Sequence, residues 1–121
     1  MKLGDYDRDG SASEFVLRIG SEACRSTSVI VGVSRLQPEL HVFTTEERPD
    51  SPLIVAPEYW DTLLRSGGKT TVEEMLCGDH GSMEQSEIEL KAKEGALHAE
   101  RKRYKCTDSG ERGRLTGTEV L

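Results

Sequence analysis

The acidic segment near the N-terminus is the part of the sequence with the most specific chemistry. Three aspartates alternate with other residues, a glycine and a serine follow, and a glutamate closes the segment. These residues are Asp5, Asp7, Asp9, Gly10, Ser11 and Glu14. Hard cations such as Ca²⁺ take about six to eight oxygen ligands, and carboxylates at alternate positions of a tight loop can converge on one point. The spacing therefore predicts a calcium loop, with Gly10 permitting the sharp turn.

Each position of this loop has a role in the calcium hypothesis. Asp5, Asp7 and Asp9 supply side-chain oxygens from the first, third and fifth positions. Ser11, at the seventh, offers its backbone carbonyl, and Glu14, at the tenth, closes the site. The alternative is a solvated acidic turn, because aspartate and glycine are ordinary turn residues. Three aspartates held close together without a cation repel one another, which favours the calcium interpretation.

The loop departs from an EF-hand, which requires a glutamate at the twelfth position, here Val16, and flanking helices. Residues 5–10 instead resemble the Asp-x-Asp-x-Asp-Gly calcium loops of FG-GAP and VCBS-type β-propeller repeats. An acidic residue and an apolar strand follow in those repeats, as they do in residues 14–17 here. The resemblance covers residues 5–16 and implies the same five ligands. The acidic residue comes one position later than in the repeats and no second repeat is present, so a propeller is not predicted.

Cysteine and histidine form a second candidate site. The three cysteines are Cys24, Cys77 and Cys106, and their odd number argues against a closed disulfide framework. Cys77 and Cys106 close two segments expected to lie side by side in the sheet, so a disulfide between them is one interpretation, and buried thiols are another. A third is zinc, because Cys77 and His80, with His98 and Cys106, supply four zinc-type ligands at irregular spacing.

A small thiol-dependent hydrolase is the catalytic alternative. In it, Cys77 is the nucleophile, His80 the base and Asp79 the group that orients the base. Catalytic triads usually draw their members from separate segments, which argues against such a compact arrangement. The sequence also contains no phosphate loop, dinucleotide fingerprint, acyl-hydrolase elbow or metalloprotease helix. A binding module is therefore favoured over an enzyme.

Short apolar runs separated by turns predict a mainly β fold. Phe15, Leu17 and Ile19 share one face of a strand, and residues 29–34 form a continuous β-branched run expected to be a central strand buried on both faces. In residues 87–93, apolar side chains alternate with charged ones. Strands are predicted at residues 15–19, 29–34, 40–45, 53–55, 70–77, 87–93 and 96–106.

One short helix, at about residues 57–66, accompanies the strands. Pro57 suits the first helical position, and Trp60, Leu63 and Leu64 form one apolar stripe. Strands at short spacing with a single helix predict a small antiparallel β-sandwich or a bent sheet. Residues 1–106 are expected to form one β-rich domain, with the polar, glycine-rich residues 107–121 as a loose tail.

Composition narrows the classes of partner. The chain of 121 residues carries a formal net charge of −6, so a nucleic-acid partner is not expected. No apolar run approaches the ~20 residues that cross a bilayer, and no signal peptide is visible. The acidic loop begins four residues into the chain, which hints that a preceding strand is missing. We expect a calcium-stabilised, non-catalytic binding or accessory module, with a lean towards an extracytoplasmic location.

Overall fold

The computed structural model describes residues 2–22, 25–35 and 37–121, so Cys24 lies outside the described residues. It contains two antiparallel sheets, as the sequence predicts. The three-stranded sheet has the order β1-β2-β3 and the four-stranded sheet the order β4-β5-β6-β7. The strands are β1 Glu14–Glu22, β2 Arg25–Gly32, β3 His41–Val42, β4 Lys69–Met75, β5 Glu84–Lys93, β6 Ala96–Cys106 and β7 Arg112–Val120.

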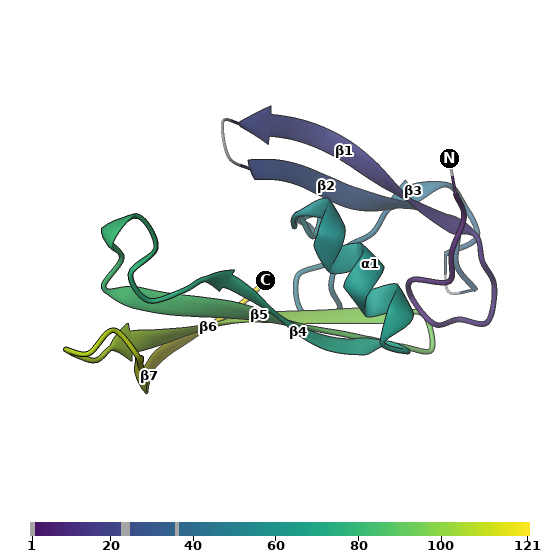
Figure 1. The fold of residues 1–121 in the computed structure, drawn as a ribbon. Coiled ribbons are helices and arrows are strands. Elements are labelled where there is room, and N and C mark those ends of the chain that lie inside the picture. The colour runs from purple at the N-terminus through teal and green to yellow at the C-terminus, as the bar shows by residue number, and fades with distance from the viewer. Residues whose placement is uncertain (1, 23–24, 36) are drawn as a thin grey trace.

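The one α-helix of the described residues, α1 (Pro57–Arg65), confirms the predicted helix and lies between the two sheets (Figure 1). Pro57 opens it, and its apolar stripe brings Trp60 and Leu63 into the core, where they are 0% and 1% exposed. The helix contacts β2 on one side and β4 and β5 on the other. Ile30 of β2 and Ile88 of β5 belong to the same core cluster as Trp60 and Leu63. The core is therefore one cluster that joins both sheets through the helix.

In the three-stranded sheet, β2 is the central strand. Val16 of β1 pairs with Ile30, and both side chains belong to the face that packs on the core. Val31, one residue further, pairs with Val42 of β3 and points to the opposite face, because successive side chains of a strand alternate. Residues 40–45 were predicted to be a full strand, but only His41–Val42 forms one.

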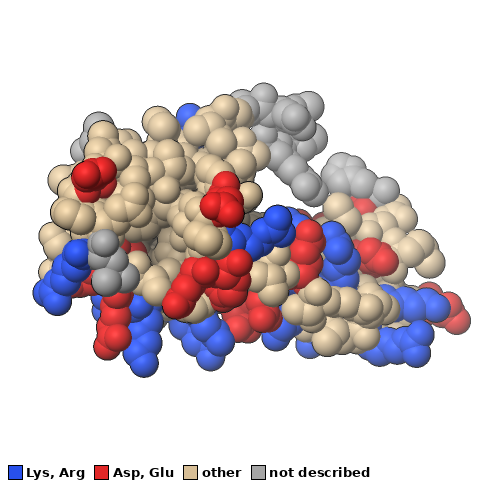
Figure 2. All heavy atoms as spheres, turned by 180° about the vertical axis from the view of Figure 1, so that it is seen from behind, with Lys and Arg blue, Asp and Glu red and all other residues tan. Residues whose placement is uncertain are grey.

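The four-stranded sheet follows the predicted alternation. Ile88, Leu90 and Ala92 of β5 are buried against the core. A tight turn at Glu94 and Gly95, both with positive φ, leads into β6. The charged side chains of this hairpin form ion pairs, for example Lys102 with Glu89 at 3.6 Å. Seen from behind, charged side chains gather over this lower sheet, whereas the upper part of the molecule is mostly uncharged (Figure 2).

The C-terminal segment corrects one prediction. Residues 107–121 were expected to be a loose tail, but Arg112–Val120 forms the edge strand β7, paired with β6. Leu121 packs against the core, and its carbonyl accepts a hydrogen bond of 2.6 Å from the Thr45 hydroxyl. The strand is held by backbone hydrogen bonds to β6 and by the contacts of Leu121. Neither requires alternating apolar residues, so the sequence pattern did not reveal the strand.

Candidate metal centre

The acidic loop leads into β1. It lies at the same end of the molecule as the N-terminus (Figure 1). Its base is closed by a short bridge in which the N–H of Gly4 donates to the carbonyl of Glu14 at 2.8 Å and the reverse bond is 3.2 Å. Within the loop, Arg8 and Gly10 adopt positive φ, of 60° and 96°. These left-handed positions fold the chain back on itself, as the sequence predicted for Gly10.

Folding in this way brings four carboxylates to one point. Asp5, Asp7, Asp9 and Glu14 each offer an oxygen, and these oxygens all lie within 4.8 Å of one another. Asp7 and Glu14 are fully buried and Asp9 is 6% exposed. Four acidic groups this close and this buried are a cluster able to hold a metal ion, because a cation offsets both their repulsion and their lost hydration.

Backbone N–H groups orient most of the carboxylate oxygens. The N–H of Asp9 lies 3.1 Å from Oδ1 of Asp5 and 3.2 Å from Oδ1 of Asp7. Glu14 accepts from the N–H of Asp7 at 3.1 Å and from the N–H of Ser13 at 3.0 Å. The side chains are thus fixed by the loop's own backbone, which preorganises the cluster.

One oxygen stands out from this network. Oδ2 of Asp7 is buried and has no hydrogen-bond partner among the described residues. Burial, a side-chain hydrogen bond with Glu14, and the charges of Glu14 and Asp9 raise the pKa of Asp7 to about 8. A buried carboxylate oxygen without a partner is costly in a folded protein, and this one is surrounded by three further acidic side chains.

The loop is also attached to both sheets. The N–H of Arg35, just beyond β2, donates to Oδ2 of Asp9 at 3.1 Å, and the hydroxyl of Ser13 lies 2.9 Å from the carbonyl of Val33. On the other side, the N–H of Gly95, in the β5–β6 turn, donates to the carbonyl of Asp7 at 2.8 Å. Sequence reasoning missed the contacts from Arg35 and Gly95, because backbone donors carry no signal in the sequence.

Ser11 occupies a different position from the four carboxylates. Its N–H donates to Oδ1 of Asp9 at 2.8 Å, and its carbonyl accepts from the N–H of Ser13 at 3.0 Å. The carbonyl predicted to be a ligand therefore already takes part in the turn, and its role as a ligand stays a prediction.

Among the described side chains, the cysteines and His98 do not come together as a zinc site. Cys77 and Cys106 form a disulfide with a Cα–Cα distance of 5.7 Å, so neither sulfur is a free thiolate. His98 lies between two carboxylates, with Nδ1 2.6 Å from Glu47 and Nε2 3.1 Å from Glu46. The side chain of His80 is outside what the structure describes. Among the described residues, the acidic loop is the one group with the spacing of a metal site.

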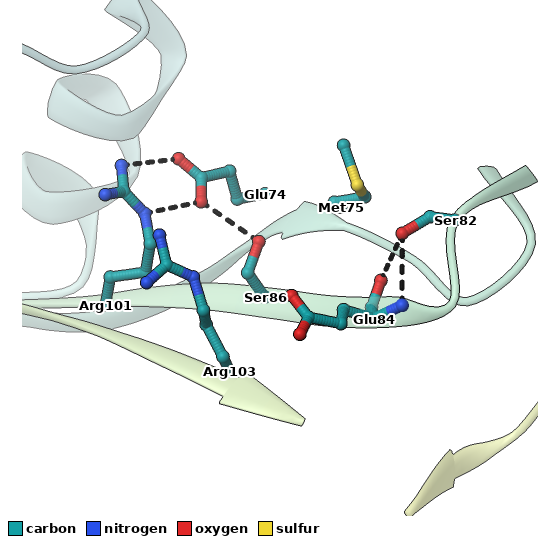
Figure 3. A pocket seen from close by; sticks show the side chains of 7 residues that line it. All are labelled: Glu74, Met75, Ser82, Glu84, Ser86, Arg101 and Arg103. Carbon is teal, nitrogen blue, oxygen red and sulfur yellow. Dashed lines mark hydrogen bonds and ion pairs between the residues drawn. The ribbon is translucent and has the colours of Figure 1, made fainter. Parts of the chain in front are cut away.

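A polar pocket lies on the inner face of the four-stranded sheet, beyond the core (Figure 3). Arg101 dominates it, because its guanidinium makes two bonds to the Glu74 carboxylate, of 2.7 and 2.9 Å, and a third of 3.0 Å to Glu119. The pocket has a volume of about 280 Å³ and is lined by Glu74, Met75, Ser82, Glu84, Ser86, Arg101 and Arg103. Its two arginines and two glutamates balance in charge, and none of the predicted site residues lies in it.

No family model, no curated protein and no solved structure matches this chain at a significant level. The resemblance to calcium loops of β-propeller repeats therefore stays local, and the supported part of it is the acidic cluster itself. None of the helices formed by the described residues has both the length and the apolar character needed to cross a membrane.

Proposed function

We propose that this chain is a non-catalytic β-domain whose acidic loop binds a calcium ion and is stabilised by it. The observation that carries the proposal is the buried Oδ2 of Asp7, which has no hydrogen-bond partner among the described residues and belongs to a cluster of four carboxyl groups. A cation supplies the missing partner, and it also removes the repulsion that the fold otherwise sustains at this point.

Calcium fits this donor set better than other common metal ions. The four carboxylates each offer an oxygen within 4.8 Å of the others, so one ion can reach all of them, and calcium takes about six to eight oxygen ligands in flexible geometry. Zinc favours nitrogen and sulfur ligands, and magnesium bonds at about 2.1 Å and usually keeps several waters. Four carboxylates in one loop are the ligands of a hard, larger cation.

The position of the loop indicates what the ion does. The loop is bonded to Arg35 beside the three-stranded sheet and to Gly95 at the turn of the four-stranded sheet. An ion held by Asp7 and Asp9 thus tightens the junction of the two sheets, which is a structural role. The disulfide favours an oxidising compartment, where calcium modules of modest affinity are saturated. We therefore place this binding or accessory module outside the cytoplasm.

Thermal melting with calcium, with magnesium as the control ion, tests the proposal. Free calcium at 100 times its dissociation constant should add about 2.7 kcal/mol to the free energy of unfolding. Asp7→Asn should abolish this gain and yet fold, because the amide fills the same space without a charge. Asp50→Asn, at an exposed aspartate, is the matched control and should keep the full calcium response.

Two results would contradict the proposal. One is a wild-type melting curve that millimolar calcium leaves unchanged. The other is an Asp7→Asn variant that responds to calcium as strongly as the Asp50→Asn control does. If magnesium raises the melting temperature as much as calcium does, the loop is a divalent-cation site that is not selective for calcium.

A further inference from the structure

Glu14 is the member of the acidic cluster that belongs to a strand, because it is the first residue of β1. It is fully buried and pairs with Gly32, the last residue of β2. A Cβ at residue 32 would come within 2.7 Å of the Cα of Glu14, so the two strands lie too close here for a larger residue. The backbone of Glu14 is therefore held by the three-stranded sheet.

The two carboxylate oxygens of Glu14 have different surroundings. Oε2 accepts from both donors of Ser13, from its N–H at 3.0 Å and from its hydroxyl at 2.7 Å. Oε1 accepts from the N–H of Asp7 at 3.1 Å. Because a carboxylate oxygen takes about two hydrogen bonds, the two donors of Ser13 fill Oε2. Oε1 is therefore the oxygen that Glu14 can offer to an ion.

The hydroxyl of Ser13 lies between two acceptors. It is 2.7 Å from Oε2 of Glu14 and 2.9 Å from the carbonyl of Val33, the residue that follows β2. A hydroxyl has one proton to donate, and a charged carboxylate is a stronger acceptor than a carbonyl. The N–H of Val33 in turn donates to the carbonyl of Ser13 at 3.4 Å. Ser13 thus connects the carboxylate of Glu14 to the end of β2.

We propose that Ser13 is a positioning residue of the metal site, whose hydroxyl occupies Oε2 of Glu14 and so directs Oε1 towards the ion. This inference rests on the calcium proposal, because it assigns a role within the same site. In this role Ser13 contacts a ligand and not the ion. Groups that orient metal ligands in this way set the affinity of a site, and their removal weakens metal binding by about 10- to 100-fold.

A purely structural role for Ser13 makes a different prediction. A buried carboxylate needs hydrogen-bond donors whether or not an ion is present, so the loss of the hydroxyl would then lower the stability of the metal-free protein and leave the calcium affinity unchanged. Ser86 provides the comparison. It is half-buried like Ser13, and its hydroxyl donates to Oε1 of Glu74 at 3.0 Å on the four-stranded sheet. Ser86→Ala therefore removes the same kind of bond outside the acidic loop.

Calcium titration of the full chain by isothermal calorimetry tests the proposal. Ser13→Ala should raise the calcium dissociation constant by about 10- to 100-fold. Ser86→Ala, the matched control, should keep the wild-type value. Ser13→Thr retains a hydroxyl and should restore most of the affinity that Ser13→Ala loses.

Folding of each variant is checked by circular dichroism in chelator. If Ser13→Ala does not fold, Ser13→Val and Ser13→Thr are compared instead. These two side chains have nearly the same shape and differ in the hydroxyl, so Ser13→Thr should bind calcium more tightly.

A Ser13→Ala variant that binds calcium as tightly as Ser86→Ala overturns the inference and leaves the calcium proposal standing. Equal affinities of Ser13→Thr and Ser13→Val overturn it in the same way, because the hydroxyl would then have no effect. A wild type that binds no calcium overturns both proposals. The two failures are therefore distinguished by the wild-type titration.

Discussion

The two sheets of this domain are stabilised in different ways. The three-stranded sheet packs one face on the core, and the loop that enters it brings four carboxylates to one point. The four-stranded sheet packs apolar side chains of its inner face on the core, carries ion pairs on that face beyond the core and on its outer face, and is linked at its far end by the disulfide between Cys77 and Cys106. The first sheet is therefore entered by a mostly buried acidic cluster that is able to hold a metal ion, whereas the second sheet pairs its charged side chains with one another.

Removing the disulfide should give the largest effect. Cys77 and Cys106 are 29 residues apart in sequence, and a cross-link of that length stabilises a fold by about 3–4 kcal/mol in the chain-entropy account. Urea unfolding of the Cys77→Ala, Cys106→Ala double variant should show that loss.

The comparison of the sheets also predicts what the double variant keeps. Its response to calcium should be unchanged, because the acidic loop lies at the other end of the molecule. A calcium response lost together with the disulfide would mean that the two sheets do not act separately.

The next effect concerns the buried acidic group. In protein kept free of metal, the pKa of Asp7 is raised to about 8, so the folded state binds a proton that the unfolded chain has lost. The free energy of unfolding should therefore fall as pH rises from about 4 to about 8, and saturating calcium should remove this slope.

Urea midpoints measured across that pH range, in chelator and in calcium, test this prediction. Asp7→Asn is the control, since its amide cannot titrate, and its midpoint in chelator should be flatter than that of the wild type. If the wild type in chelator instead becomes more stable as pH rises towards 8, the pKa of Asp7 is not raised in the folded protein.

Hydrophobic and turn patterns were sufficient to predict most of the fold. Alternation identified β5, and the proline with its apolar stripe identified α1, because both patterns follow directly from the geometry of the element. The C-terminal strand was missed for a physical reason. Gly113 suggests a loop, but a Cβ at this position would come within 2.6 Å of the carbonyl of Lys105, so glycine is what lets β7 lie beside β6.

The candidate metal site also has a part that the sequence predicted and a part that it did not. The spacing of Asp5, Asp7, Asp9 and Glu14 predicted that their side chains would converge, since local sequence determines how a tight loop folds. The anchors at Arg35 and Gly95 act through backbone N–H groups brought in by the tertiary fold. Nothing in the side chains of those residues could have identified them.

A smaller effect is expected from the ion pair on the inner face of the four-stranded sheet. Arg101 and Glu74 form two parallel bonds and are 23% and 18% exposed (Figure 3). Arg101→Met should cost about 1–2 kcal/mol, because it leaves a largely buried carboxylate without its strongest partner.

The matched control for this pair is Lys91→Met. The ion pair between Lys91 and Glu89, 3.3 Å long, involves a lysine that is 50% exposed, and its loss should cost below about 0.5 kcal/mol. Equal losses in the two variants, measured by urea unfolding, would contradict the conclusion that this sheet relies on partly buried charge pairs.

The smallest expected effect comes from an exposed contact between the two halves of the molecule. Nδ1 of His98, on β6, lies 2.6 Å from Glu47, which follows the short third strand of the other sheet, and this bond lowers the pKa of Glu47. A carboxyl whose folded pKa is lowered stabilises the protein above its ordinary pKa and loses that effect as pH falls through the folded value. Glu47→Gln should therefore cost a few tenths of a kcal/mol near neutral pH and nothing near about pH 3. This contact between the two sheets is exposed to solvent, so it should contribute little to stability. A cost above about 1 kcal/mol in urea unfolding would mean that exposed ion pairs hold the sheets together, rather than the acidic loop and the core around α1.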